Sequence, residues 1–172
     1  MRVYSSLLAV AMIVATGPAL ADPAYKSADI VTFFIKSADQ GLARGICVGT
    51  TDECASQAPK PAGFDMLINF NLDSDQLTEE AQANLGEFAK ALKDERLTAA
   101  KFVVEGHTDA SGSENHNEGL AERRAQSVTA FLLDHGVDAT KVTAVGMGER
   151  APRVPNIYDP INRRVEMRIN LQ

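Results

Sequence analysis

The sequence lacks tryptophan, contains only two cysteines and has fewer basic than acidic residues. Without indole rings, it lacks the side chain best suited to stacking on sugar rings. The 17 lysines and arginines against 23 aspartates and glutamates give a net charge of −6. This disfavours sequence-independent binding to nucleic acid, because such binding depends on clustered cations. After the first residues, no apolar run approaches the roughly 20 residues that a membrane-spanning helix needs.

The overall composition is that of an ordinary globular protein, with 45% hydrophobic and 23% charged residues. It excludes a disordered or collagen-like chain. A chain of 172 residues is expected to form one domain with a short additional segment. The acidic net charge does not by itself identify a partner.

The first 21 residues have the pattern of a secretory signal peptide. Arg2 supplies a positive start, residues 7–15 form an apolar run, and residues 19–21 (Ala-Leu-Ala) have the small-x-small pattern of a cleavage site. We therefore expect export to the periplasm and cleavage after Ala21. A membrane anchor is the alternative, but the apolar run is too short to span a bilayer. Asp22 follows the cleavage site, where a lipoprotein would have a cysteine.

Both cysteines, Cys47 and Cys54, remain after cleavage. In an oxidising compartment, this local spacing predicts one structural disulfide. Closing so short a loop would stabilise the fold by about 2.5 kcal/mol in the chain-entropy model. A metal site or a redox pair is the alternative, but the nearest histidine is His107 and no CxxC spacing exists, so no metal is expected.

Residues 22–63 differ in composition from the rest of the chain. An apolar cluster at 30–35 predicts a short helix, a glycine-rich stretch carries both cysteines, and Pro59, Pro61 and Gly63 indicate a linker. The segment is too small to form a hydrophobic core of its own. It is therefore expected to dock on the main domain or on a protein partner in the cell envelope.

Residues 64–172 show the alternation of strands and helices that defines the main domain. Thr78 can cap one helix and Gly136 can end another. The predicted elements are strands at 66–70, 102–104, 142–145 and 164–171, and helices beginning at 79 and near 117. Their order, β-α-β-α-β-β, predicts an α+β sandwich with two main helices packed on one face of a small mixed sheet.

Two elements have especially regular patterns. The first helix has an apolar stripe that consists of Ala81, Leu85, Phe88, Ala89 and Leu92. In the last strand, apolar residues alternate with polar ones, which predicts one buried and one polar face. The apolar residues are Val165, Met167, Ile169 and Leu171, and the polar ones are Arg164, Glu166, Arg168 and Asn170.

A polar loop at 106–112 leads into the second helix, where charged residues suggest a binding site. Asn117, Leu120 and Arg124 share one stripe of that helix, so Arg124 lies beside an apolar residue and requires a carboxylate. Asp109 can supply this carboxylate as an internal salt bridge. Alternatively, Asp109 and Arg124 lie apart and bind a ligand that carries both an ammonium and a carboxylate.

Five motifs together resemble the OmpA-like peptidoglycan-binding domain family. The motifs are NFNLDSDQLT (69–78), GHTDASG (106–112), NEGLAERRAQSV (117–128), GMGERAP (146–152) and NRRVE (162–166), and they occur in the family's order. Asn71, Leu72 and Ala121 differ from the residues usual in these motifs. None of these differences affects Asp109 or Arg124.

The resemblance implies non-catalytic binding, without a cofactor, to the diaminopimelate of the peptidoglycan stem peptide. In the family, the residues that correspond to Asp109 and Arg124 hold the diaminopimelate. Residues corresponding to Thr108, Asn117 and Leu120 line the same pocket, and an arginine at Arg163 or Arg164 adds a contact to a carboxylate. Asp73 matches an acidic family residue at the end of the first strand. The expected location is the periplasm, in association with the outer membrane and the cell wall.

Two other classes of function remain as alternatives. A hydrolase could use His107, Asp109 and Ser111, and a metalloenzyme could use His107, His116 and Asp109, although neither set has the spacing of a known motif. A protein-interaction module could instead dock through residues 22–63. If so, replacing Phe33 and Phe34 should abolish the partnership and spare binding to the wall.

Overall fold

The computed structural model describes residues 23–42, 63–66, 68, 70–71 and 73–170. The predicted signal peptide and the two cysteines, Cys47 and Cys54, lie outside the described residues, so cleavage and the disulfide stay predictions. Within the described parts of the chain, no helix combines the length and apolar composition needed to cross a membrane.

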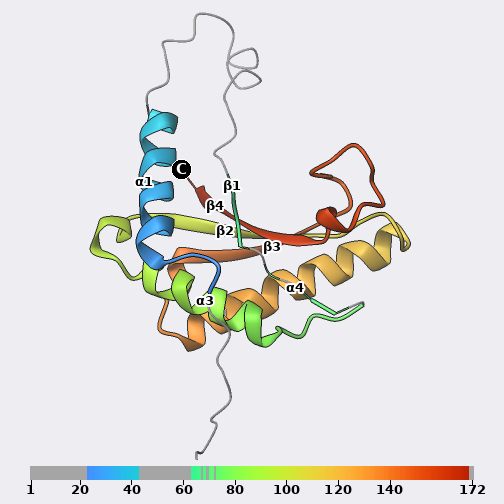
Figure 1. The fold of residues 1–172 in the computed structure, drawn as a ribbon, viewed down its shortest axis with the longest axis horizontal. Helices are drawn as coiled ribbons and strands as arrows, with labels where there is room; N and C mark the ends of the chain where they lie inside the picture. Colours follow the sequence, from blue (N-terminus) through green and yellow to red (C-terminus); the bar gives the residue numbers. More distant parts are fainter. Residues whose placement is uncertain (1–22, 43–62, 67, 69, 72, 171–172) are drawn as a thin grey trace, which may run out of the picture.

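A mixed sheet forms the centre of the domain (Figure 1). Its strands are β1 (Gly63–Asp65), β2 (Lys101–His107), β3 (Val142–Gly148) and β4 (Arg164–Asn170), in the spatial order β1-β4-β2-β3. Strands β2 and β3 are parallel, whereas β4 runs antiparallel to both β2 and β1. Helices α3 (Glu79–Leu92) and α4 (Glu114–Asp134) lie on one side of the sheet. The predicted α+β class and the order β-α-β-α-β-β are therefore confirmed.

Helix α3 forms as its sequence predicts. The Thr78 hydroxyl accepts a hydrogen bond from the Ala81 backbone N–H at 3.2 Å. Glu79 and Glu80 lie in the first turn, where negative charge stabilises the positive end of the helix dipole. The five residues of the predicted stripe are buried: Ala81, Leu85, Phe88, Ala89 and Leu92. Burial of this stripe fixes α3 against the core.

Helix α4 begins one turn earlier than predicted. Its N-cap is Ser113, whose hydroxyl accepts a hydrogen bond from the His116 backbone N–H at 3.4 Å. The polar residues at 114–116 resemble a loop in sequence, which concealed this start. The helix ends at Asp134 and is followed by Gly136 with φ +82°, in agreement with the predicted stop. Asn117 therefore lies inside the first turns of α4 rather than at its end.

The first strand was predicted at the wrong place. The structure has β1 at Gly63–Asp65, paired with β4, and the described residues of the predicted range 66–70, which are Met66, Ile68 and Phe70, lie outside it. Met66 and Ile68 are buried, with 0% and 2% exposure, but neither belongs to a strand. The apolar pattern correctly indicated burial, but burial does not require the hydrogen bonds of a sheet.

Part of the N-terminal segment docks on the main domain. Helix α1 (Ser27–Leu42) contacts α3, the short turn η1 (Glu95–Leu97) and β4. Phe34 is fully buried, and its ring lies 4.9 Å from the ring of Phe102 in an edge-to-face contact. Phe33 packs against Phe64 at 5.0 Å. Replacing Phe33 and Phe34 would therefore damage the core, and it cannot isolate a partner-binding function.

The polar face of β4 is less exposed than its alternation predicts. Val165, Met167 and Ile169 are buried in the core as expected. Arg164 and Glu166 on the opposite face are also buried, with 7% and 8% exposure. This second face of the sheet therefore carries charged side chains that must be neutralised within the fold.

Candidate functional site

A pocket of about 210 Å³ lies where β2 ends and α4 begins. Seven of the eight predicted binding residues line it, brought together from four separate segments of the chain. The lining consists of Asp73, Thr108, Asp109, Ser111, Gly112, His116, Asn117, Leu120, Arg124 and Arg163.

Asp109 provides a nearly buried carboxylate in this pocket. Its Oδ1 accepts a hydrogen bond from the Ser111 backbone N–H at 3.1 Å, and its Oδ2 lies 2.5 Å from Nη1 of Arg163. Burial alone raises the pKa of Asp109, but the hydrogen bonds from Arg163 and Ser111 bring it below its usual value. The carboxylate is therefore ionised at neutral pH.

Arg124 is buried in the wall of the same pocket and does not pair with Asp109. Its Nε donates to the Ser74 carbonyl at 3.0 Å and its Nη2 to the Asn71 carbonyl at 3.4 Å, while its guanidinium lies 4.9 Å from the ring centre of Phe70. Burial and the charge of Arg163 lower the pKa of Arg124. Among the described residues, no carboxylate lies within ion-pair distance of it. The internal salt bridge between Asp109 and Arg124 is therefore not formed.

Polar side chains fix the loop that carries Asp109. Nδ2 of Asn117 donates to the Asp109 carbonyl at 3.0 Å and to the Glu149 carboxylate at 2.5 Å. The Thr108 backbone N–H donates to the Gly148 carbonyl at 3.0 Å. The Thr108 hydroxyl is buried and has no hydrogen-bond partner within the described part of the chain, and Thr108 lines the pocket. Leu120 adds a buried apolar wall.

The mouth of the pocket carries an exposed contact between a histidine and a carboxylate. Nε2 of His116 lies 2.9 Å from Oδ1 of Asp73, and both side chains are about half exposed or more. Asp73 has a positive φ of 51°, which places it in a tight turn. Asp73 was expected at the site, whereas His116 was considered only as a metal ligand.

The two arginines of the NRRVE motif point to opposite sides of the sheet. Arg163 faces the pocket and pairs with Asp109. Arg164 is buried on the second face, where its Nε lies 2.6 Å from Oε1 of Glu166. Arg163 directly precedes β4 in an extended conformation, so its side chain leaves the backbone on the opposite side from that of Arg164. Of the two alternatives, Arg163 or Arg164, only Arg163 lines the pocket, and it is the arginine that the proposal below uses.

Sequence comparison places these residues in a known family. The sequence model of the OmpA family matches residues 69–165, which is more than half of the chain. The chain belongs to the OmpA family. The matched region contains every predicted binding residue. It also contains Phe70 and Glu149, which contact Arg124 and Asn117 and were not predicted at the site, although both lie within the quoted motifs.

Curated OmpA-family relatives are similar over the same region. Outer membrane protein A of Escherichia fergusonii is 40% identical over 103 residues, which cover 60% of this chain and 42% of the relative. Outer membrane protein A of Citrobacter freundii is 37% identical, with the same coverage. The chain thus spans less than half the length of these relatives.

Solved structures of OmpA-family domains share the fold. The peptidoglycan-associated lipoprotein of Burkholderia pseudomallei has a TM-score of 0.54 and 27% identity, covering 60% of this chain and 88% of that one. The C-terminal domain of Helicobacter pylori MotB has a TM-score of 0.52 and 24% identity, covering 61% and 83%. The second likeness concerns the fold alone.

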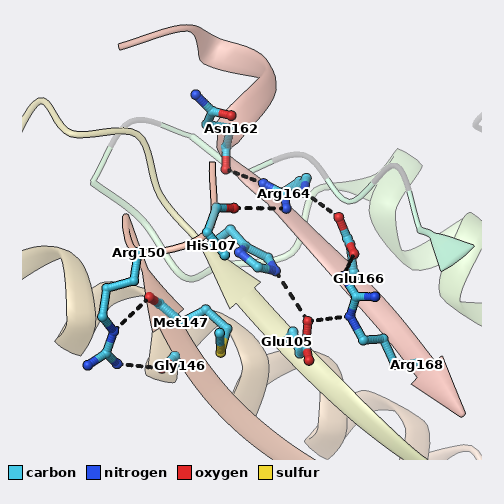
Figure 2. Close-up of polar contacts among 10 residues, drawn as sticks. Glu105, His107, Gly146, Met147, Arg150, Asn162, Arg164, Glu166 and Arg168 are labelled. Atoms are coloured by element: carbon cyan, nitrogen blue, oxygen red, sulfur yellow. Dashed lines mark hydrogen bonds and ion pairs between the residues drawn. The ribbon is translucent and has the colours of Figure 1, made fainter. Parts of the chain in front are cut away.

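The second face of this OmpA-family sheet holds a buried network of charges, here called the sheet network (Figure 2). Arg168 contacts both Glu105 and Glu166 at 2.6 Å, and Arg164 contacts Glu166 at 2.6 Å. His107, 1% exposed, lies 3.6 Å from Glu105. Burial by itself raises the pKa of Glu105, but His107 and Arg168 bring it below the usual value. The network thus pairs two carboxylates, those of Glu105 and Glu166, with two arginines, Arg164 and Arg168.

The sheet network also contains a possible set of metal ligands. One ligand atom from each of Glu105, His107 and Glu166 lies within 4.8 Å of the others. Both carboxylates, however, already contact arginines at 2.6 Å, and a divalent cation would be repelled by two guanidinium groups. We therefore regard the set as structural. His116 lies at the pocket mouth, so the proposed ligand set of His107, His116 and Asp109 is not brought together.

The hydrolase alternative requires Ser111, His107 and Asp109 to form a hydrogen-bonded relay. Within the described residues, neither ring nitrogen of His107 makes a hydrogen bond, and its nearest ionic partner is Glu105 on the second face of the sheet. Asp109 instead pairs with Arg163. The three side chains therefore do not form a relay.

Proposed function

We propose that this protein is an exported, non-catalytic module that binds peptidoglycan non-covalently by gripping the diaminopimelate of the stem peptide. The observation that carries the proposal is one pocket with a nearly buried carboxylate and a buried guanidinium that do not pair with each other. Membership of the OmpA family supports it, as does the similarity to a lipoprotein named for its association with peptidoglycan.

The pocket provides complementary groups for the end of a diaminopimelate side chain, which carries an ammonium and a carboxylate on one carbon. Asp109 takes the ammonium, and Arg124 takes the carboxylate with help from Arg163. Thr108 and Leu120 line the pocket beside these charged groups. The N-terminal end of α4, which begins beside the pocket at Glu114, also favours the bound anion.

Export would place this binding site beside the cell wall. The predicted signal peptide at residues 1–21 directs the chain to the periplasm. There the domain would anchor the cell envelope, or a protein attached to it, to the wall. Outer membrane protein A, the relative matched above, is named for a location in the same envelope.

Replacing either charged residue of the pocket should abolish retention on the wall. We expect the mature protein, residues 22–172, to sediment with sacculi that contain diaminopimelate, and Asp109→Ala and Arg124→Ala to remain in the supernatant. Each variant loses a charge-assisted hydrogen bond to the diaminopimelate, worth about 1.5–3 kcal/mol, or about 10- to 100-fold in affinity. Co-sedimentation measures this, with folding checked by circular dichroism.

Matched surface variants control for the change in charge. Asp134→Ala and Arg96→Ala alter the net charge by the same amounts but lie outside the pocket lining. They should sediment like the wild-type protein. A folded wild-type protein that stays in the supernatant would refute the proposed function. Folded pocket variants that still sediment would show that Asp109 and Arg124 do not hold the diaminopimelate.

Binding should remain constant from pH 7 to about pH 5 and should fall only below about pH 4. Asp109 binds the ammonium only when ionised, and its pKa lies below the usual value because the bonds from Arg163 and Ser111 outweigh burial. A group with a lowered pKa contributes above that value and stops contributing as the pH falls through it.

Calorimetry with free meso-diaminopimelate measures this pH dependence. The experiment uses the His116→Gln protein, so that none of the described residues that line the pocket is a histidine. A progressive loss of affinity between pH 7 and pH 5 in this variant would show that Asp109 is not the group that holds the ammonium.

A further inference from the structure

The loop between β3 and β4 exposes a cluster of apolar side chains. Ile157, Tyr158 and Ile161 are 42%, 61% and 48% exposed. They account for three of the four large hydrophobic side chains that are exposed in the described part of the chain, and we call them the apolar platform. Neighbouring exposed apolar side chains of this size commonly mark a binding surface.

The backbone of this loop is held in a fixed shape by hydrogen bonds to the side chains of Asn162 and Asp159. Asn162 is fully buried, and its Oδ1 accepts from the Arg153 N–H at 2.7 Å and from the Val154 N–H at 3.3 Å. Its Nδ2 donates to the Asn156 carbonyl at 2.8 Å. Asp159 accepts from the Ile161 N–H at 3.0 Å. The platform is therefore preorganised, which lowers the entropy lost on binding.

The platform adjoins the pocket. The Ala110 N–H, next to Asp109, donates to the Ile157 carbonyl at 3.0 Å. Pro160 lines a second hollow of about 180 Å³ together with Phe70 and the two arginines of the pocket, Arg124 and Arg163. Figure 1 shows the loop at the same end of the molecule as the start of α4. Tyr158 lies in the sequence between Ile157 and Pro160, the two residues of the loop that connect it to the pocket.

We propose that the apolar platform binds the sugar to which the stem peptide is attached, with a ring face packed against Tyr158. This inference rests on the proposed function. A pocket of about 210 Å³ encloses only the end of one residue, so a wall fragment must continue across its rim. Asp73 and His116, which line the pocket and contact each other at 2.9 Å, offer polar groups, whereas the platform offers apolar area and a phenol hydroxyl.

The size of the platform favours a sugar over a protein partner. A stable protein–protein interface buries about 800 Å² on each partner, with some 20–30 residues. The platform consists of three side chains on one loop: Ile157, Tyr158 and Ile161. Such a surface matches one or two sugar rings, which present C–H faces to an aromatic ring and hydroxyls to its polar tip.

The test compares a stem tripeptide containing diaminopimelate with the same tripeptide attached to its disaccharide. Calorimetry on the mature wild-type protein should show about fivefold to tenfold tighter binding of the disaccharide-tripeptide. Tyr158→Ala should remove this difference and leave affinity for the tripeptide unchanged. Tyr158→Phe should retain most of it, because the ring face is kept. Leu133→Ala, at an exposed apolar residue of α4 outside the platform, is the matched control.

Each outcome separates the platform from the pocket. Equal affinity of the wild-type protein for the two ligands would overturn the sugar contact while leaving the pocket intact, and would make a protein partner the remaining occupant of the platform. Equal weakening of both ligands by Tyr158→Ala would assign Tyr158 to the pocket instead. If the wild-type protein binds neither ligand, the proposed function fails and the platform inference fails with it.

Discussion

Replacing Gly106 by alanine should destabilise the protein by about 3 kcal/mol, among the larger effects of an overpacking substitution. A Cβ atom at this position would lie 2.1 Å from the carbonyl oxygen of Ala121 and 2.9 Å from its carbonyl carbon. Both are backbone atoms of α4 and cannot rotate away. The helix must therefore move away from β2, which exposes part of the core.

The same close approach recurs on the neighbouring strand. Gly146 of β3 is paired in register with Gly106, and a Cβ there would lie 2.8 Å from the backbone nitrogen of Glu122. Two glycines on adjacent parallel strands thus allow α4 to lie directly on the sheet. Because α4 carries Asn117 and Arg124, a displaced helix should also open the pocket and weaken ligand binding.

Gly86 provides the matched control for this substitution. It lies in the middle of α3, and a Cβ there would meet nothing within 4 Å. Gly86→Ala should stabilise the protein by about 0.5–1 kcal/mol, because alanine favours the helix and restricts the unfolded chain. Urea denaturation followed by circular dichroism measures both variants. A midpoint for Gly106→Ala equal to that of the wild type would contradict the close packing of α4.

Local signals predicted the fold where neighbouring residues decide the structure. Helix α3 has its cap at Thr78 and its stripe within one window of sequence, and both are confirmed. The position of β1 and the start of α4 were wrong because they depend on a pairing with β4 and on Ser113 among polar residues. The need for Gly106 depends on α4 lying against it, which no local pattern reveals.

The sequence predicted which residues line the candidate site, but it did not predict which of them contact one another. Spacing placed Asp109 and Arg124 in one region, and both line the pocket. It could not show that Arg163, 54 positions along the chain, takes the internal salt bridge to Asp109. Nor could it show that Arg124 donates to the carbonyls of Asn71 and Ser74 instead. Such contacts depend on how distant segments meet in the folded chain.

Replacing Glu166 by alanine should destabilise the protein by about 3–5 kcal/mol, which is typical of removing one partner from a buried ion pair. Glu166 is 8% exposed and accepts from Arg164 and Arg168 at 2.6 Å each. Its loss leaves the buried Arg164 guanidinium without a carboxylate in the sheet network, whereas Arg168 keeps Glu105. Glu166→Gln should be less damaging, because it retains the shape and an acceptor oxygen.

Thermal and urea denaturation measure this effect against a surface pair. Glu118 contacts Arg150 at 2.9 Å, but both side chains are about half exposed. Glu118→Ala should therefore change stability by less than about 1 kcal/mol. Equal effects of Glu118→Ala and Glu166→Ala would show that the sheet network is as weak as a solvated ion pair.

The loss of Glu166 should also weaken ligand binding, because Arg164 connects Glu166 to the loop that carries the apolar platform. Arg164 donates to the carbonyls of Ala151 and Asn162, at the two ends of the loop that carries the apolar platform. Because Glu166 holds Arg164 in place, Glu166→Ala should loosen this loop and weaken binding of the disaccharide-tripeptide more than binding of the tripeptide. A uniform loss for both ligands would instead indicate partial unfolding. A larger loss for the disaccharide-tripeptide would show that the second face of the sheet supports binding without contacting the ligand.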